Sequence, residues 1–494
     1  MSYAKILSLQ QFGLNAMPVE LECRQSLHLP SLQILGIAQL QAKSMRERVL
    51  SALESSGFRV PARKIVIQVL PECLREGSQA LDFAAAMVLL ASEGIFSIER
   101  LHKIAVLGGL RLDGSLSPVV EALALPSFFQ KQLFSSALLP YENSEVLKSA
   151  QLDGGGGFQS LKEAVDFLNR RIGRGKRREE VHRPSKNLNP NYLKIEQVEG
   201  HASAKQMLLA VAAGGHHSLL FGPRGVGKSF LASALPSILP PITVEEGQEI
   251  SAVYAMSGET WEGERPFRAP HASISRGNLL GGLGKNKFGE LSLSHGGVLY
   301  LDEVLEMDRS VLESLRTPIE EGELRLRRGD YHYRLPCRTT LLASANLCPC
   351  GLLGDSRHAC QCSRAEIRHY RRRISSALLD RIDLYYPLHQ GGELETCKAS
   401  TAEFRELATT ARASMIARQG KANSRLQGEE VFQVKAWSAS AKALWADSCQ
   451  SRGYSRRSSV ALARVAITFS DLMAQGEVQD EHLYQALFFR SDPL

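Results

Sequence analysis

The stretch that most constrains this chain is His217 to Ser229, HSLLFGPRGVGKS. A short apolar run ends at Gly222, and a glycine-rich loop then reaches Lys228 and Ser229 at the phosphate-loop spacing. The glycines let the backbone aim its N–H groups inward, the lysine reaches the outer phosphates, and the hydroxyl is placed to ligate Mg²⁺. The spacing alone could arise by chance. The apolar run before it and the helical pattern of 230–239 after it favour a nucleoside triphosphate site facing a helix N-terminus.

A second apolar run, GVLYLDE at 297–303, ends in two carboxylates. Asp302 is expected to hold the Mg²⁺ shell, and Glu303 to orient or polarise the attacking water. Such a pair alone could cap a helix or lie in a solvated turn, but its place downstream of a phosphate loop indicates catalysis. The next predicted strand, 339–345, ends at Asn346, whose amide is suited to holding the water or the γ-phosphate.

Length and composition limit the classes of protein that the sequence can encode. With 494 residues, the chain is long enough for two to four domains. The formal net charge of +7 permits a polyanionic partner without requiring one. No apolar run approaches the ~20 residues of a membrane span, and the first residues lack the apolar core of a secretory signal. We therefore expect a cytoplasmic protein with no membrane partner.

Four of the nine cysteines crowd one short segment, CPCGLLGDSRHACQC. Two C-x-C pairs around a glycine-containing turn favour a closed tetrahedral Zn²⁺ site with four thiolates, Cys348, Cys350, Cys360 and Cys362. Free thiols and a redox pair are the alternatives, and His358 could replace one ligand. The other cysteines are scattered and are typical of buried thiols.

The chain divides by pattern into several parts. Residues 1–169 alternate short apolar runs, such as 64–70, with helical patterns at 44–55 and 82–92, which predicts an α/β or α+β domain. A basic stretch, 170–189, is typical of a solvated linker, with contact to nucleic acid as the alternative. Residues 190–390 are predicted to form the nucleotide-binding domain with the cysteine insert at 346–364; a strand and turn are expected from 195 and a helix over 308–321. Residues 391–494 are predicted to be helical, with helices at 403–419, 434–449, 455–474 and 480–489.

Two segments are candidates for contact with DNA. The loop GGLGKNKFG is basic around position 286, where Lys285 and Lys287 flank Asn286. The segment 323–336 predicts a β-hairpin that turns at 329–330. We expect its exposed face to combine cations with aromatic rings, as nucleic-acid contact requires: Arg325, Arg327, Tyr331 and Tyr333. A plain surface loop and a solvated hairpin would show the same patterns.

Arg381 follows an apolar turn in SALLDRID, 376–383. An arginine here could stabilise charge on a neighbouring subunit's nucleotide, as arginine fingers do in trans. An ion pair with Asp380 or Asp383 within the same chain is the alternative.

Together these segments resemble the magnesium-chelatase-like AAA+ ATPases of the ComM/YifB family over nearly the whole chain. The resemblance rests on seven segments: Gly222-Pro223-Arg224-Gly225-Val226-Gly227-Lys228-Ser229, Arg268-Ala269-Pro270-His271, Val298 to Glu303, Asn346, Cys348-Pro349-Cys350-Gly351, Leu378 to Asp383 and Ser455 to Leu472.

The resemblance implies a fold, an assembly and an activity that the spacing of the motifs alone does not indicate. It implies a Lon-protease-like N-terminal α/β domain, an AAA+ three-layer α/β module and a C-terminal helical lid. It also implies hexameric rings with ATP and Mg²⁺ at subunit interfaces, and branch migration of DNA during recombination in natural transformation, with recombination proteins as further partners. By motif position Asn346 resembles the first sensor, Arg381 the trans-acting finger and Arg457 the second sensor on the lid.

Several positions depart from the family pattern: Arg224, Ala272-Ser273, Leu347, Ser376-Ala377 and Ile467. The residues expected to carry out hydrolysis are all present, so ATP hydrolysis is predicted. An ATP-driven chelatase subunit and a MoxR-like chaperone that remodels protein partners are the alternative functions. We place no Ser-Lys dyad in the first domain and expect no peptidase activity.

Overall fold

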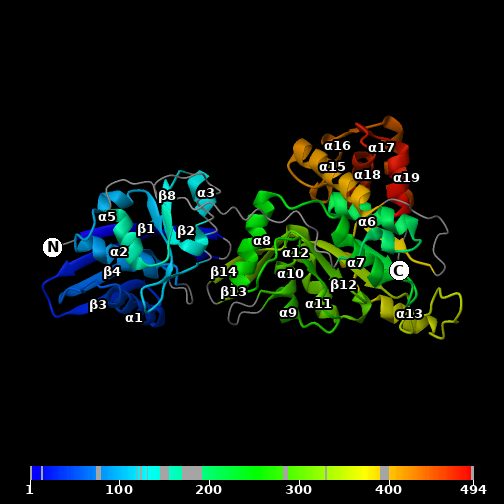
Figure 1. The fold of residues 1–494 in the computed structure, drawn as a ribbon. Helices are drawn as coiled ribbons and strands as arrows, with labels where there is room; N and C mark the ends of the chain where they lie inside the picture. Colours follow the sequence, from blue (N-terminus) through cyan, green and yellow to red (C-terminus); the bar gives the residue numbers. More distant parts are fainter. Residues whose placement is uncertain are drawn as a thin grey trace. The chain divides into compact units, whose positions relative to one another are not determined.

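A computed structural model describes residues 3–12, 15–73, 79–119, 121–122, 125–130, 132–144, 155–169, 192–281, 288–328, 331–389 and 400–490. The chain forms two compact units, 1–183 and 184–494, drawn in Figure 1. The predicted basic linker, 170–189, contains this boundary and lies outside the described residues. Within the described ranges no helix combines the length and apolar character needed to span a membrane.

The first unit is built on a seven-stranded mixed sheet in the order β3-β4-β2-β1-β5-β8-β9. Its centre, β1, β2 and β4, is antiparallel, while β3, β5, β8 and β9 add parallel to their neighbours. The strands are β1 (Tyr3–Phe12), β2 (Asn15–Ser26), β3 (Ser31–Ile37), β4 (Lys64–Cys73), β5 (Ile104–Val106), β8 (Ser136–Pro140) and β9 (Gly156–Phe158).

Alternating residues of β4 fill the core of the first unit, as the sequence predicts for a half-buried strand. Ile65, Ile67 and Val69 are buried, whereas the residues between them are only partly covered. Helices α1 (Gln39–Ser55) and α2 (Asp82–Ser92) confirm the predicted helical patterns. Helix α2 packs on β1 and β2 and is buried on nearly every side, which explains its apolar character all round. Smaller elements of this unit are β6 (Gly109–Leu110), β7 (Leu116–Ser117), α3 (Leu125–Gln130) and α5 (Leu161–Asn169).

The second unit contains a five-stranded sheet in which every strand pair is parallel, in the order β11-β12-β15-β10-β16. Strands covered on both faces read as continuous apolar runs, and all four residues of β10 and of β12 are indeed buried. The strands are β10 (Ser218–Phe221), β11 (Phe267–Arg268), β12 (Val298–Leu301), β15 (Thr340–Ala345) and β16 (Leu384–Pro387). The described helices of this part are α6 (Ala202–Gly214), α7 (Lys228–Ile238), α8 (Val244–Ser257), α9 (Arg276–Leu280), α10 (Glu290–Leu293), α11 (Arg309–Ser314), α12 (Arg316–Glu321), α13 (Arg364–Arg371) and α14 (Ser376–Leu379).

The described part of 391–494 is largely helical, as predicted. Helix α15 packs on α6 and α7, and α18 also reaches α6, so these helices close over one side of the parallel sheet (Figure 1). Helix α15 ends at Gly420, which has a left-handed φ of 69°, the conformation that glycine adopts most readily. The elements are α15 (Thr401–Gln419), α16 (Glu430–Gln433), β17 (Ala436–Trp437), α17 (Ala439–Ser451), α18 (Arg456–Leu472), β18 (Glu477–Val478) and α19 (Asp480–Phe488).

Three local predictions differ from the structure. The segment at 195–197 is a 3₁₀ turn rather than a strand, and the helix predicted over 308–321 is two short helices, α11 and α12. The helix predicted to begin at Val434 begins at Ala439, because 436–437 pair with β18 as a short strand and Ser438 caps the helix through the backbone N–H of Ala441.

The hairpin is confirmed as β13 (Glu323–Arg328) and β14 (Tyr331–Pro336), with its predicted turn at 329–330 outside the described residues. The prediction that its four candidate residues share a face is wrong. The register pairs 325 with 334 and 327 with 332, whereas Tyr331 and Tyr333 pair with Arg328 and Leu326. Cross-strand partners belong to the same face, so the two arginine positions and the two tyrosine positions alternate.

Candidate nucleotide site and cysteine cluster

The phosphate loop lies between β10 and α7 at the carboxyl end of the parallel sheet. Gly225 and Gly227 have left-handed φ values of 75° and 93°, which let the backbone turn back before the helix begins at Lys228. Gly222 is too close to its neighbours to carry a side chain, because a Cβ there would lie 2.4 Å from the carbonyl oxygen of Leu388. The first turn of α7 therefore presents unpaired N–H groups beside the loop, as an anion site requires.

Lys228 lies inside this loop. Its Nζ donates to the carbonyl oxygens of Gly222 at 2.9 Å and Pro223 at 2.8 Å, and to Oδ1 of Asn346 at 2.9 Å. Burial lowers the pKa of Lys228 to about 8, although Asp302 and Glu303 oppose the shift. The ammonium group thus joins the loop to the end of β15, where the sequence places the sensor amide.

Asp302 faces Ser229 across the site. The Ser229 hydroxyl donates to Oδ2 of Asp302 at 2.8 Å, and Oδ1 accepts from the Tyr300 hydroxyl at 2.8 Å and from Ser344. Burial alone would raise the pKa of Asp302, but the hydrogen bonds from Ser344, Tyr300 and Ser229 hold it below its usual value. The pair offers a hydroxyl and an ionised carboxylate, which are the oxygen ligands that Mg²⁺ takes beside phosphates.

Glu303 has a left-handed backbone, with φ 49° and ψ 46°. This conformation is unusual for a residue with a side chain and is held here by the backbone N–H, which donates to Asp302 Oδ1 at 3.1 Å and to Ser344 Oγ at 3.0 Å. The side chain is exposed beside the site. A constrained backbone at a solvent-facing carboxylate suits a group that orients water.

Tyr300 and Ser344 are site residues that the sequence analysis missed. Each lies on a strand two residues before a predicted site residue that follows the strand's end, Tyr300 before Asp302 and Ser344 before Asn346. The period of two along a strand could have identified them, since positions i and i+2 lie on one face.

Arg381 and Arg457 come together at a different place. The Arg381 guanidinium and that of Arg457 both pair with the Glu320 carboxylate, the latter at 3.0 Å. Burial would raise the pKa of Glu320, but the two arginines hold it below its ordinary value. The predicted alternative partners of Arg381, Asp380 and Asp383, are therefore not its ion-pair partners.

These arginines lie away from the chain's own phosphate loop. Arg381 precedes the amino end of β16, whereas the loop follows the carboxyl end of β10, and these two strands run parallel. Parallel neighbours place such positions at opposite edges of the sheet. The structure thus brings together Lys228, Ser229, Asp302 and Asn346 but not Arg381 or Arg457.

The four cysteines of the insert converge. Their ligand atoms all lie within 4.8 Å of one another, and three of the sulfur pairs are at 3.3, 3.5 and 3.6 Å: Cys348–Cys350, Cys348–Cys360 and Cys350–Cys360. Thiolates bound tetrahedrally at about 2.3 Å from Zn²⁺ would be about 3.8 Å apart. The donor set therefore fits a tetrahedral metal ion. His358 is exposed and lies beside Asp355, outside the cluster.

The cysteine segment supports the phosphate loop directly. The backbone N–H of Arg224 donates to the Gly351 carbonyl at 2.8 Å. Gly351 has a φ of 74°, and a Cβ there would lie 3.2 Å from Cβ of Arg224. The Leu353 N–H donates to Cys348 Sγ at 3.3 Å, so the same turn joins the cluster to the nucleotide loop.

The DNA candidates are described only in part. Position 286 and its flanking lysines lie outside the described residues, and so do the side chains of Arg327, Tyr331 and Tyr333. Arg325 is exposed and pairs with Glu321 at 3.2 Å.

Three family models match the chain. Residues 194–395 match the family described as magnesium chelatase, subunit ChlI; residues 19–143 match subunit ChlI of Mg-chelatase; and residues 398–490 match the ChlI C-terminal family. Two similar proteins cover almost the whole chain. Uncharacterized protein YifB of Salmonella typhimurium is 31% identical over 99% of this chain and 97% of its own length. Competence protein ComM of Haemophilus influenzae is 30% identical over 99% and 98%.

A more distant relative is the magnesium-chelatase 38 kDa subunit of Cereibacter sphaeroides, which is 28% identical over 30% of this chain and 51% of its own length. The matches along both units, together with the near-complete coverage by the first two relatives, agree with the parallel sheet and phosphate-loop site described above. The chain belongs to the magnesium-chelatase-like ComM/YifB family of AAA+ proteins.

Proposed function

We propose that the protein is a ring-forming AAA+ motor that hydrolyses ATP and acts on DNA, promoting branch migration of recombination intermediates in natural transformation. The observation that carries the ATPase part is the meeting of Lys228, Ser229, Asp302 and Asn346 around one loop. Family membership supports the same motor activity.

In this proposal Lys228 exchanges its carbonyl partners for the outer phosphates of ATP. Ser229 and Asp302 would hold Mg²⁺, which supplies neutralising charge to the phosphates when bound. Glu303 orients the attacking water, and Asn346 holds the water or the γ-phosphate. The four cysteines would hold Zn²⁺ as a structural ion that fixes the turn supporting Arg224.

Arg381 and Arg457 are proposed to act on the nucleotide of a neighbouring subunit. Their location at the amino edge of the sheet, away from the chain's own loop, supports action in trans. In a hexameric ring, the Glu320 carboxylate that holds both arginines would be replaced by the neighbour's phosphates.

The DNA part rests on the family resemblance, on the match to a competence protein and on the basic hairpin. The chelatase matches favour a second candidate, an ATP-driven subunit of a metal-insertion complex. A chelatase would require partner subunits and a porphyrin, and DNA would not stimulate its ATPase.

The test is the steady-state ATPase rate of the full chain with no DNA, single-stranded DNA and branched DNA. We expect stimulation by DNA, with a loss of about 10²-fold or more in rate for Glu303→Gln. Glu306→Gln, which removes an exposed carboxylate three residues on, is the matched control and should keep the rate. Arg325→Ala should reduce stimulation, while Arg309→Ala on α11 should not.

A rate that depends on Glu303 but ignores every DNA would retain the ATPase and reject the DNA motor. Strand exchange on a branched substrate then tests branch migration itself. DNA-stimulated hydrolysis without movement of the branch point would reject that step.

A further inference from the structure

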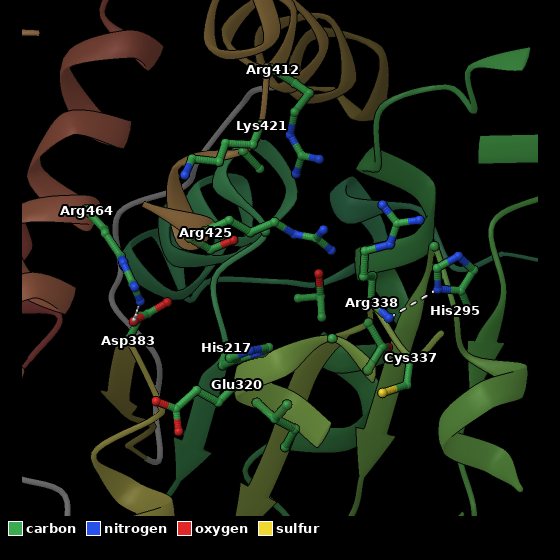
Figure 2. Close-up of a pocket in the computed structure, with 18 of the residues that line it drawn as sticks. His217, His295, Glu320, Cys337, Arg338, Asp383, Arg412, Lys421, Arg425 and Arg464 are labelled. Atoms are coloured by element: carbon green, nitrogen blue, oxygen red, sulfur yellow. Dashed lines mark hydrogen bonds and ion pairs between the residues drawn. The ribbon is translucent and has the colours of Figure 1, made fainter. Parts of the chain in front are cut away.

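A large cavity lies within the second unit, between the parallel sheet and the helical segment. Its volume is about 1030 Å³, close to the upper limit for ligand-binding clefts. More arginine and lysine side chains than carboxylates line it. Figure 2 shows several of these cations directed toward its interior.

The floor of the cavity is the edge of the sheet opposite the phosphate loop. It includes His217, Gly297 and Thr340, which lie at or just before the amino ends of β10, β12 and β15. The phosphate loop, Asp302 and Asn346 follow the carboxyl ends of the same strands. Because these strands are parallel, the cavity and the proposed ATP site of one chain are separate places.

Two of the interior arginines already pair with carboxylates. Arg265 pairs with Glu246 at 2.6 Å and donates to the carbonyl oxygens of Pro240 and Gly296. Arg338 pairs with Glu249, which also pairs with His295 at 3.1 Å. These contacts form the wall of the cavity on the sheet side.

Arg412 and Arg425 face this wall from the helical segment. Neither forms an ion pair with a carboxylate among the described residues. Arg412 donates only to the backbone carbonyls of Ala212 and Ala213 at the end of α6. No hydrogen bond or ion pair joins the Arg425 guanidinium to a described residue, and Figure 2 shows it reaching into the cavity from 423–425.

The cations also act on one another. Burial lowers the pKa of Arg412 to about 10, and Arg265 and Arg425 add to the shift while Glu246 opposes it. Burial likewise lowers the pKa of Arg425, where Arg338 adds to the shift and Glu249 and Glu246 oppose it. The two opposing carboxylates are the ones that already pair with Arg265 and Arg338. Guanidinium groups gathered in a partly desolvated cavity repel one another unless an anion lies between them.

From this arrangement we propose that the cavity binds an oligophosphate anion, of the class that includes nucleoside di- and triphosphates, between Arg425 and Arg412 on the helical side and Arg338 on the sheet side. Planar guanidinium forks match phosphate oxygens in pairs, and backbone and hydroxyl groups at Gly297 and Thr339 line the same space. The bound anion would join the helical segment to the sheet at the edge opposite the ATP site. Arg381, Arg457 and Glu320, which the proposed function assigns to a neighbour's nucleotide, also line this cavity, so the test below uses Arg425, which that function does not use.

The experiment measures binding of inorganic tripolyphosphate to the full chain by calorimetry, in a Lys228→Ala background that disables every phosphate loop, including that of a neighbouring subunit. We expect binding that Arg425→Gln weakens about tenfold, the loss of one charge-assisted contact. Arg368→Gln, an exposed arginine on α13 outside the cavity, is the matched control and should leave the affinity unchanged.

A short single-stranded oligonucleotide provides the second arm. If the oligonucleotide competes with tripolyphosphate and this competition is lost in Arg425→Gln, DNA backbone phosphate is a source of the same chemistry. If the oligonucleotide binds more tightly than tripolyphosphate, the choice of a free anion is overturned. No binding in the Lys228→Ala background, or binding that Arg425→Gln does not weaken, would overturn the site itself. Circular dichroism of Arg425→Gln separates loss of binding from loss of fold.

Discussion

Among single residues, Lys228 is the one whose burial should affect the affinity for nucleotide, because burial changes its pKa. Its pKa of about 8 in the free protein reflects burial beside the loop carbonyls. Triphosphate oxygens favour the charged ammonium, so nucleotide binding should raise this pKa and take up a proton above pH 8.

We therefore predict that ATP affinity is level below about pH 8 and falls by up to about tenfold per pH unit above it, because the free protein then holds neutral lysine. Calorimetry between pH 7 and 9.5, in buffers of different ionisation enthalpy, measures both the affinity and the proton uptake. Lys228→Arg keeps its charge throughout and should give a flat profile. An equal slope in that variant would assign the pH dependence to another group.

Single residues also show which parts of the site can be predicted from the sequence. Spacing predicted Lys228, Ser229, Asp302 and Asn346, and the structure brings all four together. It could not predict that Glu320 binds both Arg381 and Arg457, because that contact joins residues separated by 61 and 137 positions. No periodicity in a single sequence encodes such a meeting.

At the scale of elements, the cysteine turn acts as a support for the phosphate loop. The hydrogen bond from the Arg224 N–H to the Gly351 carbonyl, next to Cys350, joins the turn to the loop. A metal ion would hold this turn in place, since four thiolates at one centre fix the backbone between them.

We predict one Zn²⁺ per chain by elemental analysis. Removing it with a chelator, followed by restored Mg²⁺, should weaken ATP binding about tenfold, the order expected when a supporting contact is lost. The far-ultraviolet spectrum should stay close to that of the untreated protein, because the sheet and helices form separately from the turn. Cys360→Ser should reproduce the effect, and Cys449→Ser, which changes a cysteine on α17, should not. Unchanged affinity in the zinc-free protein would reject the support.

Elements also explain where sequence prediction failed. Strands β10, β12 and β15 were predicted because apolar runs of that length are typical of parallel strands. The face assignment in the hairpin was wrong although a two-residue turn at 329–330 implies the observed register, in which Arg328 pairs with Tyr331. Cross-strand partners share a face, and the expectation for the two arginines and the two tyrosines did not follow this rule.

At the scale of the second unit, the helical segment and the sheet share one core. Leu208 and Leu220 belong to the same buried cluster as Phe404 and Leu462. The sequence predicted a separate helical part at 391–494 because composition changes there, but shared burial cannot be read from composition.

A polar chain crosses this core: His216 contacts Asp383 at 3.0 Å and Thr468 at 2.7 Å, and all three are buried. We predict that Asp383→Asn lowers the free energy of unfolding by about 2–4 kcal/mol, because it replaces a buried carboxylate, the charged partner of the His216 contact, with a neutral amide. Urea unfolding of the full chain measures this loss. Asp447→Asn, at an exposed position on α17, should change stability by less than about 0.5 kcal/mol.

The proposed ring allows a sharp test of the proposed role of Arg381 in trans. If Arg381 serves a neighbour's nucleotide, Lys228→Ala and Arg381→Ala are each inactive for different reasons. The Lys228→Ala variant lacks a working phosphate loop but retains the arginine finger, and the Arg381→Ala variant retains the loop but lacks the finger.

Mixing the two variants before assembly should restore hydrolysis at interfaces that combine an intact loop with an intact finger, about a quarter of all interfaces in randomly mixed rings. ATPase assays of the separate and mixed variants measure this rescue. Mixtures that stay as inactive as their components, although mass measurement shows mixed rings, would place Arg381 outside the neighbour's site.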